Sequence, residues 1–186
     1  MPEVIVVGDG PGGLSAALFL AKNKLDVVVF GIDKTAMHYA LIRNYLGLTE
    51  IHGSEFQKRA REQVTAFGAR LRDEQVTEVA RTSTGWSVTL ASGDRLTARY
   101  LVLSEGKAPV LAKQLGLVFD DVNGIATDRN ARTEIGAYVV GRSARPGRSQ
   151  TIISAGDGAA AAIDILSREK GTSFVDWDEP PKSPES

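Results

Sequence analysis

The sequence predicts an α/β domain with a parallel sheet, and three features near its start support this prediction. The β-branched run Val4–Val7 ends in the glycine-rich segment Gly8–Gly13. Apolar residues then recur at helical spacing over residues 14–21. Asp26–Phe30 follows as a second apolar run, which is typical of a strand covered on both faces. Strand, helix and strand together predict one βαβ unit.

Gly8, Gly10 and Gly13 carry the spacing G-x-G-x-x-G. In such a turn the first glycine permits the bend, the second lets backbone approach a pyrophosphate, and the third lets the helix pack closely on the strand. The amides at the helix start then face the anion. The strand before the turn and the helix after it strengthen the prediction of a dinucleotide site. The alternative is a turn whose glycines only join a strand to a helix.

Composition excludes several classes of function. The chain has 186 residues, of which 42% are hydrophobic, enough for the core of one domain. The net charge of -1 gives no overall electrostatic case for binding nucleic acid or an anionic membrane. No apolar run reaches the roughly 18 residues of a membrane span, and the first apolar stretch lacks the basic leader of a secretion signal. We therefore expect a cytoplasmic protein with neither nucleic acid nor membrane as a partner.

The chain contains no cysteine. A disulfide, a thiolate zinc site, a catalytic thiol and a redox-active dithiol are therefore excluded within these 186 residues. His38 and His52 are the only imidazoles, and no H-E-x-x-H motif is present, so we expect no metal site.

The end of the second strand is unusual for a dinucleotide site. In many such folds this strand ends in an acid about 20 residues beyond the glycines, and that acid binds the ribose hydroxyls. Here Gly31 occupies the strand end and Asp33 follows two residues later. Asp33 is the candidate ribose ligand, and an exposed loop aspartate in an Asx-turn is the alternative.

The middle of the chain predicts short elements. Residues 34–47 read as a loop with a short helical piece. Ser54–Gln57 has the form of a capping box and predicts a helix to about Phe67, with one apolar face. Turn signals then separate three runs that predict a small antiparallel meander leading into a buried strand: Val76–Val79, Trp86–Leu90 and Arg95–Leu103.

The last third predicts a return to the main sheet. Pro109–Leu117 reads as a helix or irregular crossover, Gly124–Asp128 as an edge strand and Ala137–Gly141 as a buried strand. A long alanine-rich helix is expected over Ser149–Glu169. Residues 1–172 then form a single domain, and residues 173–186 are polar and proline-rich, which predicts a disordered C-terminal tail.

Five blocks occur in a fixed order: Gly8–Gly13, Asn44–Gly47, Ser104–Gly106, Ala137–Arg142 and Gln150–Gly158. In this order the chain resembles, over residues 3–170, the FAD domain of the low-molecular-weight thioredoxin reductases. The resemblance implies a Rossmann-like FAD-binding domain, with a parallel sheet, helices and a small antiparallel β-meander. The chain departs from the family pattern at four places. Leu46 stands in place of a proline, Ser104-Glu105 in place of Ala-Thr, Arg142 in place of an aspartate, and Ser149 in place of the arginine before Gln150.

The resemblance implies FAD as the cofactor and assigns candidate roles. The glycine turn would hold the pyrophosphate, and the helix starting near Gln150 would aim its amides at the flavin ring, where reduction develops negative charge. The alternative for that helix is tight packing without a ligand. The cofactor-binding candidates are Gly8, Gly10, Pro11, Gly12, Gly13, Asp33, Asn44, Gly106, Gly141, Arg142, Gln150 and Thr151.

Arg142 leaves three roles open: it could bind the diphosphate bidentately, point into solvent or exclude FAD. Arg145 and Arg148 extend this basic loop, which either binds phosphate or an acidic partner or forms a solvated face. By resemblance, His38 and Tyr39 lie on a loop that approaches the flavin, although a structural histidine is the simpler interpretation. No catalytic acid, base or nucleophile is identified.

The departures from the family pattern shape the expected function. In the family an NADPH domain that also carries the redox dithiol follows the Ala-Thr-Gly strand, whereas here only Lys107–Asn123 lies there. The resemblance therefore implies a homodimeric flavoprotein that passes electrons between an external donor and an acceptor, for example a redox protein. One alternative is a non-catalytic flavin- or nucleotide-binding sensor or docking module. Another is an enzyme that binds NAD in the glycine turn.

Overall fold

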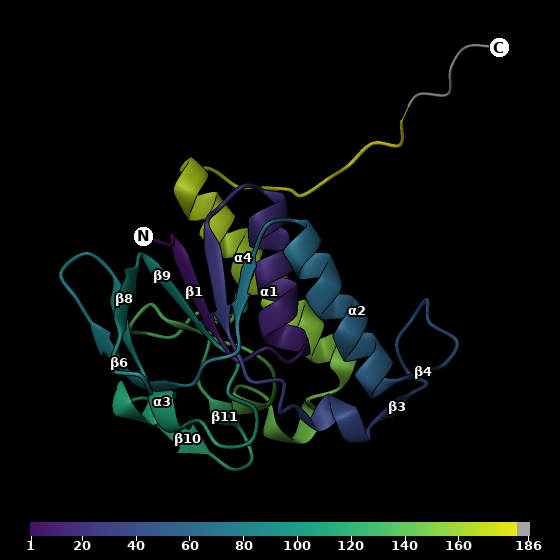
Figure 1. Ribbon diagram of the computed structural model, residues 1–186, viewed down its shortest axis with the longest axis horizontal. Helices are drawn as coiled ribbons and strands as arrows, with labels where there is room; N and C mark the ends of the chain where they lie inside the picture. The colour runs from purple at the N-terminus through teal and green to yellow at the C-terminus, as the bar shows by residue number, and fades with distance from the viewer. Residues whose placement is uncertain (182–186) are drawn as a thin grey trace.

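The computed structural model describes residues 1–181, and a five-stranded parallel sheet lies at its centre (Figure 1). Every neighbouring pair in this sheet is parallel. The strand order is β12 (Tyr138–Val139), β9 (Tyr100–Leu103), β1 (Val4–Val7), β2 (Val27–Phe30) and β5 (Arg70–Arg72). Because all strands run the same way, their carboxyl ends meet at one edge of the sheet, where open α/β sheets bind ligands.

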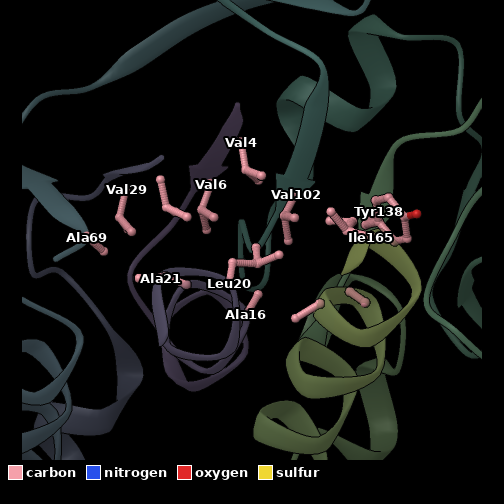
Figure 2. Close-up of a cluster of buried hydrophobic side chains, with 14 of the residues drawn as sticks. Val4, Val6, Ala16, Leu20, Ala21, Val29, Ala69, Val102, Tyr138 and Ile165 are labelled. Carbon is pink, nitrogen blue, oxygen red and sulfur yellow. The ribbon is translucent and has the colours of Figure 1, made fainter. Parts of the chain in front are cut away.

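Three helices cover one face of this sheet, namely α1 (Pro11–Lys22), α2 (Gly53–Ala66) and α4 (Thr151–Lys170) (Figure 1). Alternate strand residues such as Val4 and Val6 point toward them, because successive side chains of a strand face opposite sides. Figure 2 shows these valines above Leu20 of α1, with Tyr138 lying against Ile165 of α4. The continuous apolar runs seen in the sequence are thus buried on both faces.

The opposite face carries a three-stranded antiparallel sheet of β6 (Val76–Arg81), β7 (Trp86–Leu90) and β8 (Arg95–Ala98). Helix α3 (Val110–Gln114) lies beside it. A second apolar cluster fills this layer and includes Ile5, Trp86 and Leu101. The predicted parallel sheet with helices and an antiparallel meander is confirmed.

Smaller elements surround the sheet edge. β3 (Leu41–Ile42) pairs with β4 (Ile51–His52), and β10 (Phe119–Asp120) pairs with β11 (Gly124–Ile125). The 3-10 helices are η1 (Ala36–Tyr39), η2 (Gly141–Ser143) and η3 (Pro146–Arg148). The edge strand predicted for Gly124–Asp128 is shorter than expected, since only its first two residues pair.

The predicted capping box of α2 is wrong. The helix begins at Gly53, and the residue that caps it is His52, whose Nδ1 accepts a hydrogen bond from the Ser54 amide at 3.3 Å. Gln57 does not reach back to Ser54. Its amide is fully buried and donates to the carbonyl of Asp9 at 2.6 Å. The side chain that would complete the box therefore holds the glycine turn.

Residues 171–181 form no regular element, yet the start of this segment contacts the domain. Phe174 packs against the apolar core, and Lys22 of α1 pairs with Asp176 at 2.8 Å and with Asp178 at 2.5 Å. Residues 182–186, the end of the predicted disordered tail, lie outside the described residues. Within residues 1–181, no helix combines the length and apolar character needed to cross a bilayer.

Candidate functional site

A cavity of about 710 Å³ lies at the carboxyl edge of the parallel sheet. Its lining comes from the segments that follow β1, β2, β5, β9 and β12, together with the start of α4. This volume is within the range of about 300–1,000 Å³ that is usual for ligand pockets. The fold thus places a ligand-sized hollow where the sequence predicts a nucleotide.

The three glycines of the turn have different tasks. Gly8 adopts a φ of +99°, and a Cβ there would lie 2.1 Å from the Ser104 carbonyl oxygen. A Cβ at Gly13 would lie 2.0 Å from the Gly8 carbonyl oxygen. A Cβ at Gly10, in contrast, would have no neighbour nearer than Thr35 Oγ1 at 3.8 Å. Gly8 and Gly13 therefore serve close packing, and Gly10 leaves its backbone open to the cavity, as a pyrophosphate requires.

The charges around this turn suit an anion. Helix α1 starts at Pro11 with Gly10 as its N-cap, and no acidic side chain lies in its first turn, so its positive end is not neutralised there. Lys34 and Arg142 also line the cavity and are exposed. Neither makes a hydrogen bond or ion pair within residues 1–181, so both cations are available to a diphosphate.

Helix α4 approaches the glycine turn through backbone contact. A Cβ at Gly158 would lie 2.0 Å from the Gly12 carbonyl oxygen and 2.9 Å from the Ala16 amide nitrogen. This close crossing brings Ser149 and Thr151, at the start of α4, into the cavity lining. The cavity therefore runs from the N-terminus of α1 to that of α4.

The chain matches only part of the length of its sequence relatives. The chain is 39% identical over 110 residues to a bifunctional thioredoxin reductase/thioredoxin from Mycobacterium leprae, covering 56% of this chain and 24% of that protein. It is 36% identical over 122 residues to a thioredoxin reductase from Mycolicibacterium smegmatis, covering 62% and 37% respectively. The chain thus spans about a quarter to two fifths of the length of the curated relatives it matches. No protein-family model matches the chain.

Solved structures share the fold. The atypical thioredoxin reductase TRi from Desulfovibrio vulgaris Hildenborough superposes with a TM-score of 0.83 at 18% identity, covering 92% of this chain and 99% of the other. A thioredoxin reductase from Gloeobacter violaceus gives a TM-score of 0.84 at 17% identity, covering 96% and 99%. The chain has the fold of these thioredoxin reductases.

The structure brings most of the predicted site residues of this thioredoxin reductase-like chain together. Lining the cavity are Gly8, Gly10, Pro11, Gly12, Gly106, Gly141, Arg142 and Thr151. Outside the lining are Gly13, Asp33, Asn44 and Gln150. Asn44 and Gln150 bond to each other, the Asn44 Nδ2 donating to the Gln150 Oε1 at 2.9 Å. Their assignments to the cofactor remain predictions.

Asp33 makes its contacts beside the cavity. Its φ is +52°, and its carboxylate Oδ1 lies 3.1 Å from His38 Nε2. His38 Nδ1 lies 3.0 Å from Ser54 Oγ, so this histidine joins the loop after β2 to α2. Neither His38 nor Tyr39 lines the cavity, and Tyr39 is 93% exposed.

Two acids of the site were not singled out from the sequence. Glu105 lines the cavity after β9, and its carboxylate accepts the amides of Leu111 at 2.7 Å and Ala112 at 2.9 Å. Burial raises the pKa of Glu105, against the lowering effect of these amides. Asp9 is buried inside the glycine turn and forms an ion pair with Arg61 of α2. A charged residue among glycines was the available signal for Asp9.

Proposed function

We propose that this chain is an FAD-binding, thioredoxin reductase-like oxidoreductase that passes electrons between an external donor and an external acceptor. The observation that carries the proposal is the cavity that joins the open backbone of Gly10 to the start of α4. When bound, FAD supplies the redox chemistry through its isoalloxazine ring. The chain would bind and orient it: the amides of α1 and the cations Lys34 and Arg142 would hold the diphosphate. The N-terminus of α4, at the other end of the cavity, would stabilise the negative charge that develops on the ring during reduction.

The same proposal holds that the chain is not itself a dithiol reductase. It contains no cysteine, so it has no thiol pair to oxidise or reduce. Between β9 and β10 there is only α3 with its flanking loops, too little chain for a second nucleotide-binding domain. Electrons must therefore enter and leave through other molecules.

Those partners include a redox protein and, by resemblance to the family, a second copy of the chain, in the cytoplasm. Tyr39 and Leu46 are 93% and 90% exposed, and Leu41 is also exposed. These apolar side chains lie on the segment from η1 to the β3–β4 connection. Exposed apolar side chains gathered on one segment suit a protein interface. Sedimentation of the loaded protein tests the dimer.

The deciding experiment identifies the bound nucleotide. The protein purified without added flavin is denatured, and the released nucleotide is separated and identified. The apoprotein is then titrated with FAD, FMN and NAD⁺. We expect FAD to be released or to bind most tightly. If no flavin is released and none binds when supplied, the proposal is refuted, and binding of NAD⁺ alone would indicate the NAD enzyme instead.

A non-catalytic flavin sensor or docking module is the second candidate, favoured by the lack of an inserted donor domain between β9 and β10. Anaerobic mixing of the loaded protein with NADPH, NADH or a reduced ferredoxin-like protein separates the two functions. Bleaching of the flavin followed by turnover on an acceptor supports the oxidoreductase. A flavin that only dithionite reduces supports the sensor.

A further inference from the structure

We propose that the carboxylate of Asp9, within the glycine turn, binds the ribose hydroxyls of the adenosine half of the dinucleotide. This inference rests on the proposed function and adds a specificity-determining residue to it. In dinucleotide folds the ribose acid usually projects from the end of the second strand. Here β2 ends at Phe30 and is followed by Gly31, which has no side chain to offer.

The Asp9 carboxyl group occupies the space above that glycine. A Cβ at Gly31 would lie 2.3 Å from Asp9 Cγ and 2.5 Å from Asp9 Oδ1. Any side chain at Gly31 would therefore collide with Asp9. The glycine at the strand end and the acid in the turn form one arrangement, in which the acid reaches the end of β2 from the neighbouring strand β1.

The protein fixes one oxygen of this carboxylate and leaves the other accessible. Oδ2 accepts hydrogen bonds from the guanidinium of Arg61 and from the Asp33 amide, the latter at 3.2 Å. Oδ1 accepts none within residues 1–181. Oδ1 is also not fully buried, because among residues 1–181 the fully buried side-chain polar atom without a partner is Gln57 Oε1. Asp9 lines the cavity, and Oδ1 is the carboxylate oxygen left free to accept from a ligand there.

Neighbouring contacts hold Asp9 in this position. Gln57, fully buried on α2, donates to the Asp9 carbonyl at 2.6 Å. Arg61 also bonds Asp73 at 2.6 Å, which anchors the guanidinium from its far side. Asp33, the acid expected from the sequence, contributes its amide to Asp9 and its carboxylate to His38, and it lies outside the cavity lining.

The rival explanation is that Asp9 only anchors Arg61 and α2. Binding affinities for ADP, 2′-deoxy-ADP and 3′-deoxy-ADP, measured by calorimetry, separate the two roles. The proteins compared are the wild type, Asp9→Asn, Asp33→Asn and Asp73→Asn. Asp73→Asn is the matched control, because it removes a carboxylate from the same arginine but lies outside the cavity lining. A melting temperature for each variant reports its folding.

We expect the wild type to prefer ADP over the deoxy nucleotides by about ten- to a hundredfold, the range for a hydrogen bond to a charged group. Asp9→Asn should lose most of this preference and weaken FAD binding by a similar factor, and Asp73→Asn should keep both. If Asp9→Asn fails to fold, Asp9→Ser replaces it. Equal affinity of the wild type for ADP and the deoxy nucleotides would overturn the inference even if no variant folds.

The other outcomes are equally decisive. Unchanged discrimination in folded Asp9→Asn, or loss of discrimination in Asp33→Asn instead, overturns the role of Asp9 while FAD binding, and with it the proposed function, stands. Failure of the wild type to bind ADP, FAD or any flavin refutes the proposed function and this inference together.

Discussion

Replacing Gly158 by alanine should separate helices α1 and α4 and lower the stability of the protein. The added Cβ would lie 2.0 Å from the Gly12 carbonyl oxygen, whereas an ordinary contact begins near 3.4 Å. The carbonyl oxygen belongs to the backbone of α1, and the added Cβ is fixed to the backbone of α4. No side-chain rotation can therefore relieve the overlap. The two helices must move apart by more than about 1 Å at a fully packed crossing.

The size of the effect follows from two opposing terms. Overpacking typically costs about 1–3 kcal/mol, and a backbone collision belongs at the upper end. Alanine gains about 1 kcal/mol over glycine in a helix interior. The net loss for Gly158→Ala is therefore about 2 kcal/mol, or about 4–8 °C in Tm for a chain of this size.

Gly156→Ala is the matched control within the same helix. A Cβ at Gly156 meets nothing within 4 Å, so only the gain in helix propensity remains. This variant should melt about 2–4 °C higher than the wild type. Thermal unfolding followed by circular dichroism measures both changes. Because α4 carries Thr151 into the cavity, Gly158→Ala should also weaken FAD binding and Gly156→Ala should not. Equal melting temperatures for the two variants would show that the close crossing of α1 and α4 is not formed.

Three further predictions concern the cavity and the tail. Gly10→Val should keep the fold, because a Cβ there meets nothing closer than 3.8 Å. It should nevertheless abolish nucleotide binding, because the side chain fills the space over the turn. Normal affinity in a flavin titration would refute the assignment of this turn to the phosphates. Burial raises the pKa of Glu105 above its ordinary 4.5, so the folded state holds that proton more tightly than the unfolded chain. The wild type should therefore lose stability as the pH rises through and above 4.5, and urea unfolding of Glu105→Gln should show a flatter pH dependence; parallel profiles would contradict this. Removing residues 178–186 should change the Tm little, because the Asp178 side chain is 73% exposed in its ion pair with Lys22. Removing residues 173–186 also takes Phe174 away from the core and should cost about 1–2 kcal/mol; equal Tm values for the two truncations would argue against that packing.

Periodicity and turn residues predicted the elements with strong patterns. The apolar runs at β1 and β2, the glycine turn and the long helix α4 are found where expected. Their signals are local, since a strand covered on both faces must be apolar throughout and a turn with positive φ favours glycine. The same signals located the cavity, because parallel strands bring their carboxyl ends together.

Elements without a local pattern were missed. β5 consists of Arg70-Leu71-Arg72, and it lies at the sheet edge, where its arginines pair with Asp26 and Glu74. Charged side chains suit an exposed edge strand, but they remove the apolar signature of a strand. The cap of α2 was missed for a related reason. Histidine is not among the preferred N-cap residues, whereas serine, which stands two residues later at Ser54, is one of them.

The departures of this chain from the family pattern are better understood as exchanges between neighbouring segments than as losses. In the role proposed for Asp9, its carboxylate, which lies across from Gly31, takes the place of the acid absent from the end of β2. The aspartate that Arg142 replaces has a counterpart in Asp157 of α4, whose carboxylate accepts the Gly141 amide at 3.3 Å and pairs with Arg145 at 2.9 Å. Since Asp157 already satisfies the amide of Gly141 and the charge of Arg145, Arg142 remains as a cation at the cavity.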